Sequence, residues 1–163
     1  MSEAVPKILK VLIGQVHLTR PPNLMEAVLG SCVGVAIFDE KDGIAGLAHV
    51  FLPDSGGKPA ETLPGKYADH AVESLVEGIR SHGGNGKLRA KIAGGARMFG
   101  PAKEGAPPDV GTLNIAATRE ALKRFDIPII GADTGGTCGR RVCFNPANRE
   151  YLVESFNNER RIL

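Results

Sequence analysis

The segment LGSCVGVAIFDEKDGIAGLAHVFL, residues Leu29–Leu52, decides the fold that this sequence predicts. Two apolar runs rich in β-branched residues, Val33–Phe38 and Ile44–Leu52, flank a polar cluster that ends in Asp42-Gly43. Apolar runs of this length around an Asp-Gly turn signal are typical of an antiparallel β-hairpin. We therefore expect a hairpin here, with its turn inside the polar cluster.

The register of this hairpin determines which side chains become neighbours. Residues paired across a hairpin have numbers with a constant sum, and the turn places Phe38 opposite Gly43 or the residue after it. Cys32 then lies opposite His49 or Val50. Directly paired residues have Cβ atoms about 4.5–5.5 Å apart, so the Cys32 thiol is expected beside the His49 imidazole. A thiol next to an imidazole is the minimum set of groups for nucleophilic catalysis.

A structural interpretation of Cys32 and His49 stands beside the catalytic one. Free cysteine is among the most buried residue types, so Cys32 can be a small core residue and His49 a hydrogen-bonded core histidine. Gly30 and Ser31, directly before Cys32, favour catalysis. Glycine lets the backbone approach a ligand closely, and successive free N–H groups there, with the Ser31 hydroxyl, can bind an oxyanion.

Length and composition predict one soluble domain covering residues 1–163. Hydrophobic residues make up 42% of the chain and charged residues 23%, which is ordinary for a globular protein. The net charge of +2 is too small to indicate a nucleic-acid partner or an anionic membrane surface. No apolar run approaches the roughly 18 residues of a membrane span, and the first residues do not resemble a signal peptide. Three cysteines, an odd number, fit free thiols in the cytoplasm.

The order of expected elements favours an α+β fold, with a mostly antiparallel sheet and helices packed on its outer faces. Besides the hairpin, strands are expected at Ile8–Gly14, Leu24–Leu29, Leu88–Ala93, Pro128–Ala132, Arg141–Phe144 and Tyr151–Glu154. Helices are expected at Ala68–His82 and at Asn114–Phe125, the second with Asn114 or Thr112 as its N-cap. Segment His17–Asn23 is expected to be a loop, as are the Pro/Gly-rich stretches Leu52–Lys66 and Gly100–Gly111.

The other motifs in the sequence do not predict a functional site. The segment Gly83–Lys87 lacks the first glycine and the final Ser or Thr of a phosphate-binding loop. Four residues lie between Cys138 and Cys143, and no paired histidines lie nearby, which argues against zinc. Arg140-Arg141 can bind a carboxylate or phosphate, but a solvated strand end is the preferred interpretation. No metal and no organic cofactor are expected.

Several segments, taken together and in order, resemble the chemoreceptor glutamine deamidase family, CheD. The likeness covers nearly the whole chain, from about Ile8 to Glu154. It is carried by LGSCVGVAIFD at Leu29–Asp39, AGLAHVFLPDS at Ala45–Ser55, PGKYADHAV at Pro64–Val72, AKIAGGARMF at Ala90–Phe99, LNIAATREAL at Leu113–Leu122 and ADTGGTCGRRVCFN at Ala132–Asn145.

The resemblance implies a cysteine hydrolase that converts glutamine side chains of methyl-accepting chemoreceptors to glutamate, with release of ammonia. The family's nucleophile falls on Cys32 and its general base on His49. Its fold is a layered α/β/β/α sandwich similar to that of the deamidating cytotoxic necrotizing factors. The family also pairs with a CheC-type phosphatase.

One position departs from the family pattern, which has a Thr six residues before the nucleophile as third member of the catalytic set. Here that position is Glu26. Residues 26, 28, 30 and 32 share one face of an extended segment, so Glu26 is expected to reach His49 and orient its imidazole. The alternative is a solvated Glu26 with the third role unfilled.

The Glu26 departure also supports a non-catalytic alternative, an adaptor that binds receptor helices or a phosphatase through its two Pro/Gly-rich loops. Thiol reactivity separates the two functions. An enzyme is expected to have Cys32 alkylated quickly at neutral pH, at a rate that depends on His49.

Overall fold

The computed structural model describes residues 5–60, 62–100 and 103–163. Within these ranges the chain forms ten strands and two helices. They are β1 (Ile8–Lys10), β2 (Val16–Thr19), β3 (Leu24–Leu29), β4 (Val33–Asp39), β5 (Ala45–Val50), α1 (Ala68–Ser81), β6 (Leu88–Gly94), α2 (Val110–Arg124), β7 (Ile129–Thr134), β8 (Arg140–Asn145), β9 (Glu150–Ser155) and β10 (Arg160–Ile162).

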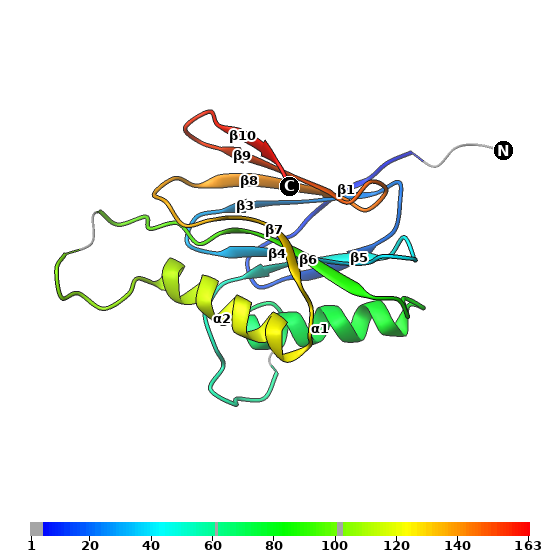
Figure 1. Cartoon of the computed structure of the whole chain (residues 1–163), viewed down its shortest axis with the longest axis horizontal. Helices are drawn as coiled ribbons and strands as arrows, with labels where there is room; N and C mark the ends of the chain where they lie inside the picture. Colours follow the sequence, from blue (N-terminus) through cyan, green and yellow to red (C-terminus); the bar gives the residue numbers. More distant parts are fainter. Residues whose placement is uncertain (1–4, 61, 101–102) are drawn as a thin grey trace.

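The strands form two stacked sheets of five strands each (Figure 1). The first, here called the β3 sheet, has the order β1-β3-β8-β9-β10, and the second, the β4 sheet, has the order β2-β5-β4-β6-β7. Every pairing is antiparallel except β1 with β3 and β6 with β7. The predicted α+β sandwich of mostly antiparallel strands is therefore confirmed.

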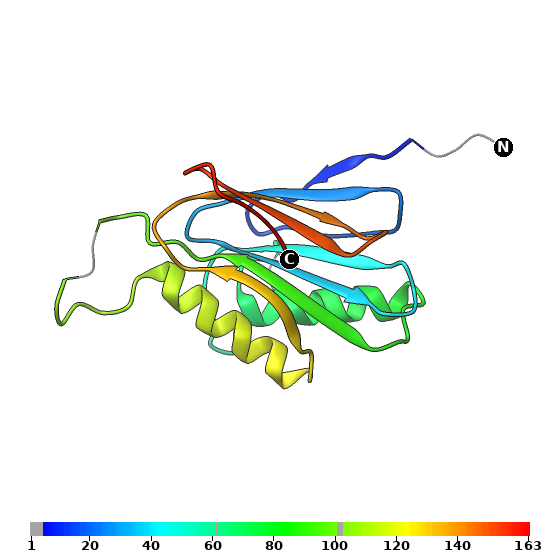
Figure 2. The ribbon, with the colours of Figure 1, turned by 45° about the horizontal axis from the view of Figure 1, so that its top comes forward.

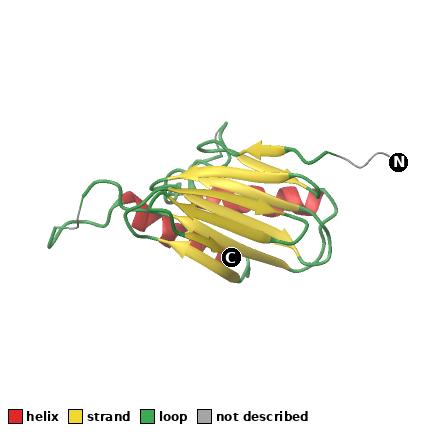
Figure 3. Cartoon of the chain, turned by 90° about the horizontal axis from the view of Figure 1, so that it is seen from above, coloured by secondary structure: helices red, strands yellow, loops and turns green. Residues whose placement is uncertain are grey.

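Both described helices pack on the same face of the sandwich. Figure 1 shows α1 and α2 below the β4 sheet; in Figure 2 strands of this sheet pass in front of α1, and Figure 3 shows the strands lying over both helices. The layers thus run sheet, sheet, helices, whereas helices were expected on both outer faces. Along β3, buried Met25, Ala27 and Leu29 face the other sheet, while Leu24, Glu26 and Val28 lie on the outer face of the β3 sheet, which no described helix covers. Neither described helix is long and apolar enough to cross a membrane.

Strand β4 is buried along its whole length because it has a core on each side. Val33, Val35 and Ile37 face the helices and join the core formed with α1 and α2. Ala36 and Phe38 face the other way and join the core between the two sheets. Full burial of a Val, Ile or Phe side chain is worth about 1.5–3 kcal/mol, so these side chains anchor β4 firmly in the fold.

The hairpin between β4 and β5 forms as predicted, but its register differs. Phe38 pairs with Ala45 and Gly34 with His49, so the paired numbers sum to 83 instead of 81 or 82. The reason is Asp39, which extends β4 by one residue and donates its backbone N–H to the carbonyl of Ile44. The expectation that Cys32 lies directly opposite His49 or Val50 is therefore wrong.

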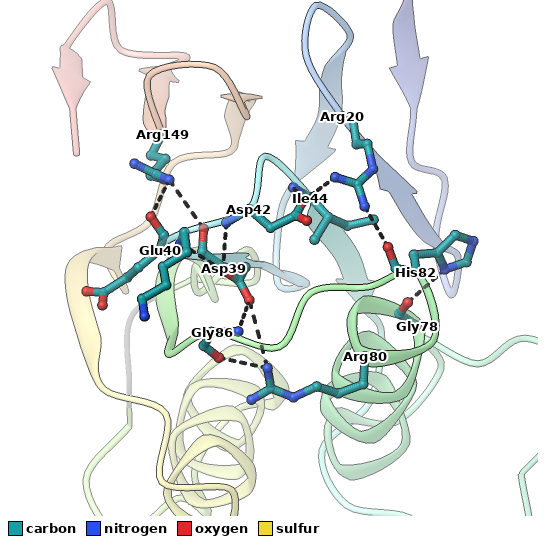
Figure 4. Close-up of polar contacts among 11 residues, drawn as sticks. Arg20, Asp39, Glu40, Asp42, Ile44, Gly78, Arg80, His82, Gly86 and Arg149 are labelled. Atoms are coloured by element: carbon teal, nitrogen blue, oxygen red, sulfur yellow. Dashed lines mark hydrogen bonds and ion pairs between the residues drawn. The ribbon is translucent and has the colours of Figure 1, made fainter.

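The Asp39 carboxylate, fully buried, organises this turn (Figure 4). One oxygen accepts hydrogen bonds from the backbone N–H groups of Lys41 and Asp42, both 2.8 Å long, and the other accepts from the N–H of Gly86 at 2.6 Å. Arg80 of α1 lies 3.8 Å away. Burial raises the pKa of the carboxyl, but these hydrogen bonds and the Arg80 charge outweigh it and lower the pKa below its usual range. Asp39 thus ties the hairpin turn to the loop that follows α1.

Several elements differ from the sequence prediction. The strand expected at Ile8–Gly14 ends at Lys10, and strand β10 was not expected. The expected loop at His17–Asn23 begins inside strand β2, whose His17 pairs with Leu47 at the edge of the β4 sheet. Helix α2 begins one turn earlier than expected, with Asp109 at its N-cap. The Thr112 hydroxyl donates to the Asp109 carboxylate at 2.5 Å, a contact that stabilises the first turn despite the glycine between them.

We predict that Asp39→Ala lowers the free energy of unfolding by about 1–3 kcal/mol, because buried N–H groups lose their acceptor. Urea denaturation at pH 7 measures this loss. A depressed carboxyl pKa contributes stability above its unfolded value of about 3.9, so the difference between variant and wild type should shrink as the pH falls below 4. Lys41→Ala, an exposed residue of the same turn, is the control and should leave stability unchanged. A pH-independent loss would contradict the role of the charge.

Candidate active site

The corner at residues 30–32, between β3 and β4, is held from behind by its carbonyl groups. All three carbonyl oxygens accept a hydrogen bond from segments distant in sequence. The donors are the N–H of Ala96 to Gly30 (3.0 Å), the side-chain amide of Asn114 to Ser31 (3.0 Å) and the N–H of Gly95 to Cys32 (2.8 Å).

The N–H groups of this corner have no such partners. Neither Ser31 nor Cys32 donates a backbone hydrogen bond to any residue in the described part of the chain. Because the carbonyls are fixed, the peptide planes are fixed as well, and two adjacent N–H donors are left free. Such a pair is suited to stabilise an oxyanion, as expected for Ser31 and its glycine neighbour Gly30.

Two glycines make this arrangement possible. Gly94 and Gly95 have φ angles of +105° and +71°, which L side chains rarely adopt. A Cβ on Gly94 would lie 2.3 Å from the Cys32 carbonyl oxygen, and one on Gly95 would lie 2.4 Å from Ile115. These two glycines belong to the motif AKIAGGARMF, but only their positive φ angles and close contacts reveal their role.

Cys32 lies in the core between the sheets and is only 6% exposed. Burial raises the pKa of its thiol to about 11. The thiol is therefore neutral at rest. The expectation of fast alkylation at neutral pH does not fit this environment.

His49 of β5 is 3% exposed, and its two ring nitrogens differ in their surroundings. Nδ1 lies 2.9 Å from the carbonyl oxygen of Val11, which can only accept, so Nδ1 carries the proton. Nε2 is buried and has no hydrogen-bond partner among the described residues. Burial lowers the pKa of His49, and the hydrogen bond to Val11 only partly offsets this. The imidazole is thus a neutral base with a free lone pair on Nε2.

Cys32 and His49 lie on the same face of the β4 sheet. His49 pairs with Gly34, and Cys32 precedes Gly34 by two residues, so the two are diagonal neighbours facing the β3 sheet. Diagonal neighbours are about 7–8 Å apart between Cα atoms, within reach for long side chains. No hydrogen bond joins the Cys32 sulfur and the His49 imidazole; contacts between catalytic groups often tighten only when substrate binds.

Comparison with known proteins identifies the family of this chain. The family model described as CheD chemotactic sensory transduction matches residues 51–155. A probable chemoreceptor glutamine deamidase CheD from Oceanobacillus iheyensis is 40% identical over 162 residues, 98% of each chain. The chemoreceptor glutamine deamidases CheD of Halalkalibacterium halodurans (37% over 151 residues, 91% of this chain and 93% of that protein) and Bacillus subtilis (40% over 149 residues, 90% of each) are also similar.

The chain belongs to the CheD family. The resemblance predicted from the sequence motifs is thereby confirmed. The range matched by the CheD family model begins after His49, so the roles of Cys32 and His49 depend on the geometry described above.

In this CheD-family chain, Glu26 does not share a face with His49. Met25, Ala27 and Leu29 point into the core between the sheets, so Glu26 points outward, where it lies beside Cys143 of β8. The expected alternation fails because the corner at residues 30–32 interrupts the extended chain. The Val11 carbonyl orients His49 instead, by accepting the hydrogen bond from Nδ1. A backbone carbonyl cannot be recognised as such a partner from the sequence, because every residue has one.

A groove of about 470 Å³ borders this corner at Ser31. It runs between the loop after β6 and the start of α2, and its lining includes Arg97, Met98, Lys103 and Phe99, the last 92% exposed. A larger cavity of about 890 Å³ lies at the other end of the β4 sheet, near Leu88 and Phe125, and touches none of the corner residues. Of these two, only the groove at Ser31 borders the corner, and it ends one residue short of Cys32.

Other candidate residues serve the fold. Among the described residues, no group of three or more His, Cys, Asp or Glu side chains is placed to hold a metal ion. Cys138 and Cys143 are free thiols. The expectation of a solvated Arg140 is wrong: it is buried, with its guanidinium 3.2 Å from the Asp133 carboxylate and 2.7 Å from the Gly135 carbonyl. Arg141 alone is exposed.

We predict that iodoacetamide alkylates Cys32 slowly at neutral pH and that its rate is still rising at pH 10, because only the thiolate reacts and the thiol pKa is about 11. Peptide mass spectrometry after timed reaction at several pH values measures this. The same protein in concentrated urea is the control, where Cys32 should react with the profile of an ordinary thiol. A native rate that levels off near pH 7 would contradict the buried, neutral thiol.

Proposed function

We propose that this protein deamidates glutamine side chains of methyl-accepting chemoreceptors, with Cys32 as nucleophile and His49 as base. The observation that carries this proposal is the placement of His49 and Cys32 on one face of the β4 sheet. The Nε2 of His49 has a free lone pair there, and the N–H groups of Ser31 and Cys32 have no partner among the described residues. Further support comes from relatives named chemoreceptor glutamine deamidase.

The first half of the reaction forms a thioester. Nε2 of His49 takes the proton of the Cys32 thiol while the sulfur attacks the carboxamide carbon of the glutamine. The electron pair of the carbonyl moves onto its oxygen, which the N–H groups of Ser31 and Cys32 stabilise. The imidazolium then gives its proton to the amide nitrogen, the carbon–nitrogen bond breaks, and ammonia leaves.

The second half releases glutamate. His49, neutral again, accepts a proton from water as the water oxygen attacks the thioester carbon. The tetrahedral intermediate collapses, the carbon–sulfur bond breaks, and the proton returns to the Cys32 sulfur. No metal or organic cofactor takes part in these steps. The product glutamate adds one negative charge to the receptor.

The low polarity of the site sets the timing of the proton transfer. Burial raises the pKa of Cys32 and lowers that of His49, so an ion pair at rest is disfavoured. The thiolate forms only as the attack on a docked carboxamide proceeds. The Val11 carbonyl then takes the orienting role that Glu26 was expected to have, since it faces the imidazolium as it forms.

The partners follow from this assignment. The substrate is a glutamine on a cytoplasmic helix of a chemoreceptor, reaching Cys32 through the groove at Ser31. We place the protein in the cytoplasm and include a CheC-type phosphatase among its partners, on the strength of the family resemblance.

We predict that Cys32→Ala and His49→Ala each reduce deamidation of a cytoplasmic receptor fragment at least about 10³-fold, since each removes a group that the reaction requires. Peptide mass spectrometry follows the conversion of glutamine to glutamate. Cys138→Ala, a free cysteine outside the site, is the matched control and should retain full activity. Normal turnover by folded Cys32→Ala would rule out this mechanism. If the wild-type protein binds the receptor fragment but does not deamidate it, the non-catalytic adaptor function would be favoured.

The pH dependence of kcat/KM should report the lowered pKa of His49. A protonated imidazole cannot accept the thiol proton, so activity falls as the pH drops through the pKa of His49. Because burial lowers this pKa, the acidic half-point is expected below about 6.5, the ordinary value for histidine. Rates between pH 4.5 and 8 on the same fragment test this. A half-point above 6.5 would mean that His49 is not the base in this environment.

Glu26→Gln is predicted to leave kcat within about twofold of the wild-type value, because its carboxylate lies on the outer face of the β3 sheet. Glu154→Gln, which removes another carboxylate close to Cys143, is the matched control. Steady-state rates of both variants on the receptor fragment decide the matter. A loss of tenfold or more confined to Glu26→Gln would restore its orienting role.

A further inference from the structure

Asn114 of α2 connects the two chain segments that carry Cys32 and His49. Its side chain is fully buried, and its Nδ2 donates to the carbonyl oxygen of Ser31 at 3.0 Å and to that of Phe51 at 3.1 Å. Both partners can only accept, so the nitrogen of the amide must face them. Ser31 directly precedes Cys32, and Phe51 follows His49 by two residues.

The position of this amide along the hairpin gives it a specific effect. The ladder between β4 and β5 ends with the pair Val33 and Val50. In the same register the next pair would be Cys32 and Phe51, but the chain turns away there into the corner at residues 30–32. Asn114 bridges the two diverging strand ends where the ladder stops.

Asn114 is itself held in place by the glycine turn that binds the corner. A Cβ on Gly111, in the first turn of α2, would lie 2.5 Å from the Ala96 carbonyl oxygen, so the helix packs directly on the backbone after β6. Gly95 contacts Ile115, the residue after Asn114, in the same way. Because Gly95 and α2 pack directly against each other, the two hydrogen bonds they donate to the corner are coupled. The N–H of Gly95 donates to the Cys32 carbonyl, and the amide of Asn114 donates to the Ser31 carbonyl.

The oxygen of the Asn114 amide does not explain why an asparagine stands at this position. Its Oδ1 is buried without a hydrogen-bond partner among the described residues. An unpaired buried oxygen is unfavourable for stability. The two hydrogen bonds from Nδ2 are thus the contribution of this side chain.

We infer that Asn114 is a positioning residue for the deamidation, which sets the Cys32 segment against the His49 segment and fixes the peptide plane that carries the free N–H of Cys32. This inference rests on the proposed roles of Cys32 and His49. Asn114 does not touch the substrate. It acts through the backbone of Ser31, one bond away from the N–H of Cys32.

The test compares Asn114→Ala with Thr118→Val. Thr118 lies one turn further along the same buried face of α2, and its hydroxyl also lacks a described partner. Thr118→Val removes a buried polar atom from the same helix at nearly constant volume, without touching the corner, and should leave activity unchanged. Steady-state kinetics on the receptor fragment are measured for both variants below their melting temperatures.

For Asn114→Ala we expect kcat to fall about 10- to 100-fold, because misplacement of reacting groups by about 1 Å has effects of this size. KM should stay within about threefold. At the same time iodoacetamide should alkylate Cys32 faster than in the wild type, since the corner loosens. Cys138 and Cys143, measured in the same digest, should keep their rates. Lower turnover together with faster alkylation of Cys32 alone is the signature of a lost positioning contact.

A merely structural Asn114 gives a different result. The melting temperature of Asn114→Ala would fall while kcat and the alkylation rate of Cys32 stayed at wild-type values, and this would overturn the inference. If Asn114→Ala does not fold, Asn114→Leu, which removes both donated hydrogen bonds at nearly constant volume, is measured instead, with the same two outcomes. Activity of Cys32→Ala would instead overturn the proposed mechanism, so the two failures are distinguishable.

Discussion

The burial of strand β4 on both of its faces is the constraint on which the rest of this structure depends. Its alternate side chains enter two separate cores, one with the helices and one between the sheets. A strand held in this way cannot shift register or rotate, because any slip exchanges the residues of the two cores. Strand β4 therefore fixes the position of the corner at residues 30–32, which precedes it, and of His49 on the neighbouring strand β5.

The groups of the candidate site are held in place by hydrogen bonds to the backbone more than by contacts between side chains. Three carbonyls of the corner accept hydrogen bonds, while two N–H groups are left free. The imidazole of His49 is oriented by a backbone carbonyl as well. The site thus depends on glycines with positive φ angles and on the close packing of α2, since these bring the donors and acceptors into place.

Much of the fold could be predicted from residue patterns. Strand β3 has the predicted bounds, and α1 and β6 differ from theirs by one residue, because alternation and helical periodicity follow directly from the burial of one face. The position of the hairpin was also predicted, but its register was not, since Asp39 reads as a turn residue and only its buried contacts with Gly86 and Arg80 show otherwise. The edge strand β2 was missed because prolines follow it closely.

The candidate site was predictable as far as it depends on residue types. Cys32, His49 and Ser31 stand out by chemistry and spacing. The Val11 carbonyl could not be predicted, because any residue has a carbonyl, and the role of Asn114 depends on a contact across 83 positions of sequence. Glu26 was misplaced because the alternation rule assumes an unbroken strand, and the corner at residues 30–32 breaks it.

The burial of Cys32 has a consequence for the durability of the protein. Peroxides and other oxidants attack the thiolate, and susceptibility rises with exposure. A neutral sulfur, 6% exposed, is a poor target for them. Cys32, the proposed nucleophile, is therefore protected from oxidative damage as long as its thiol stays buried and neutral.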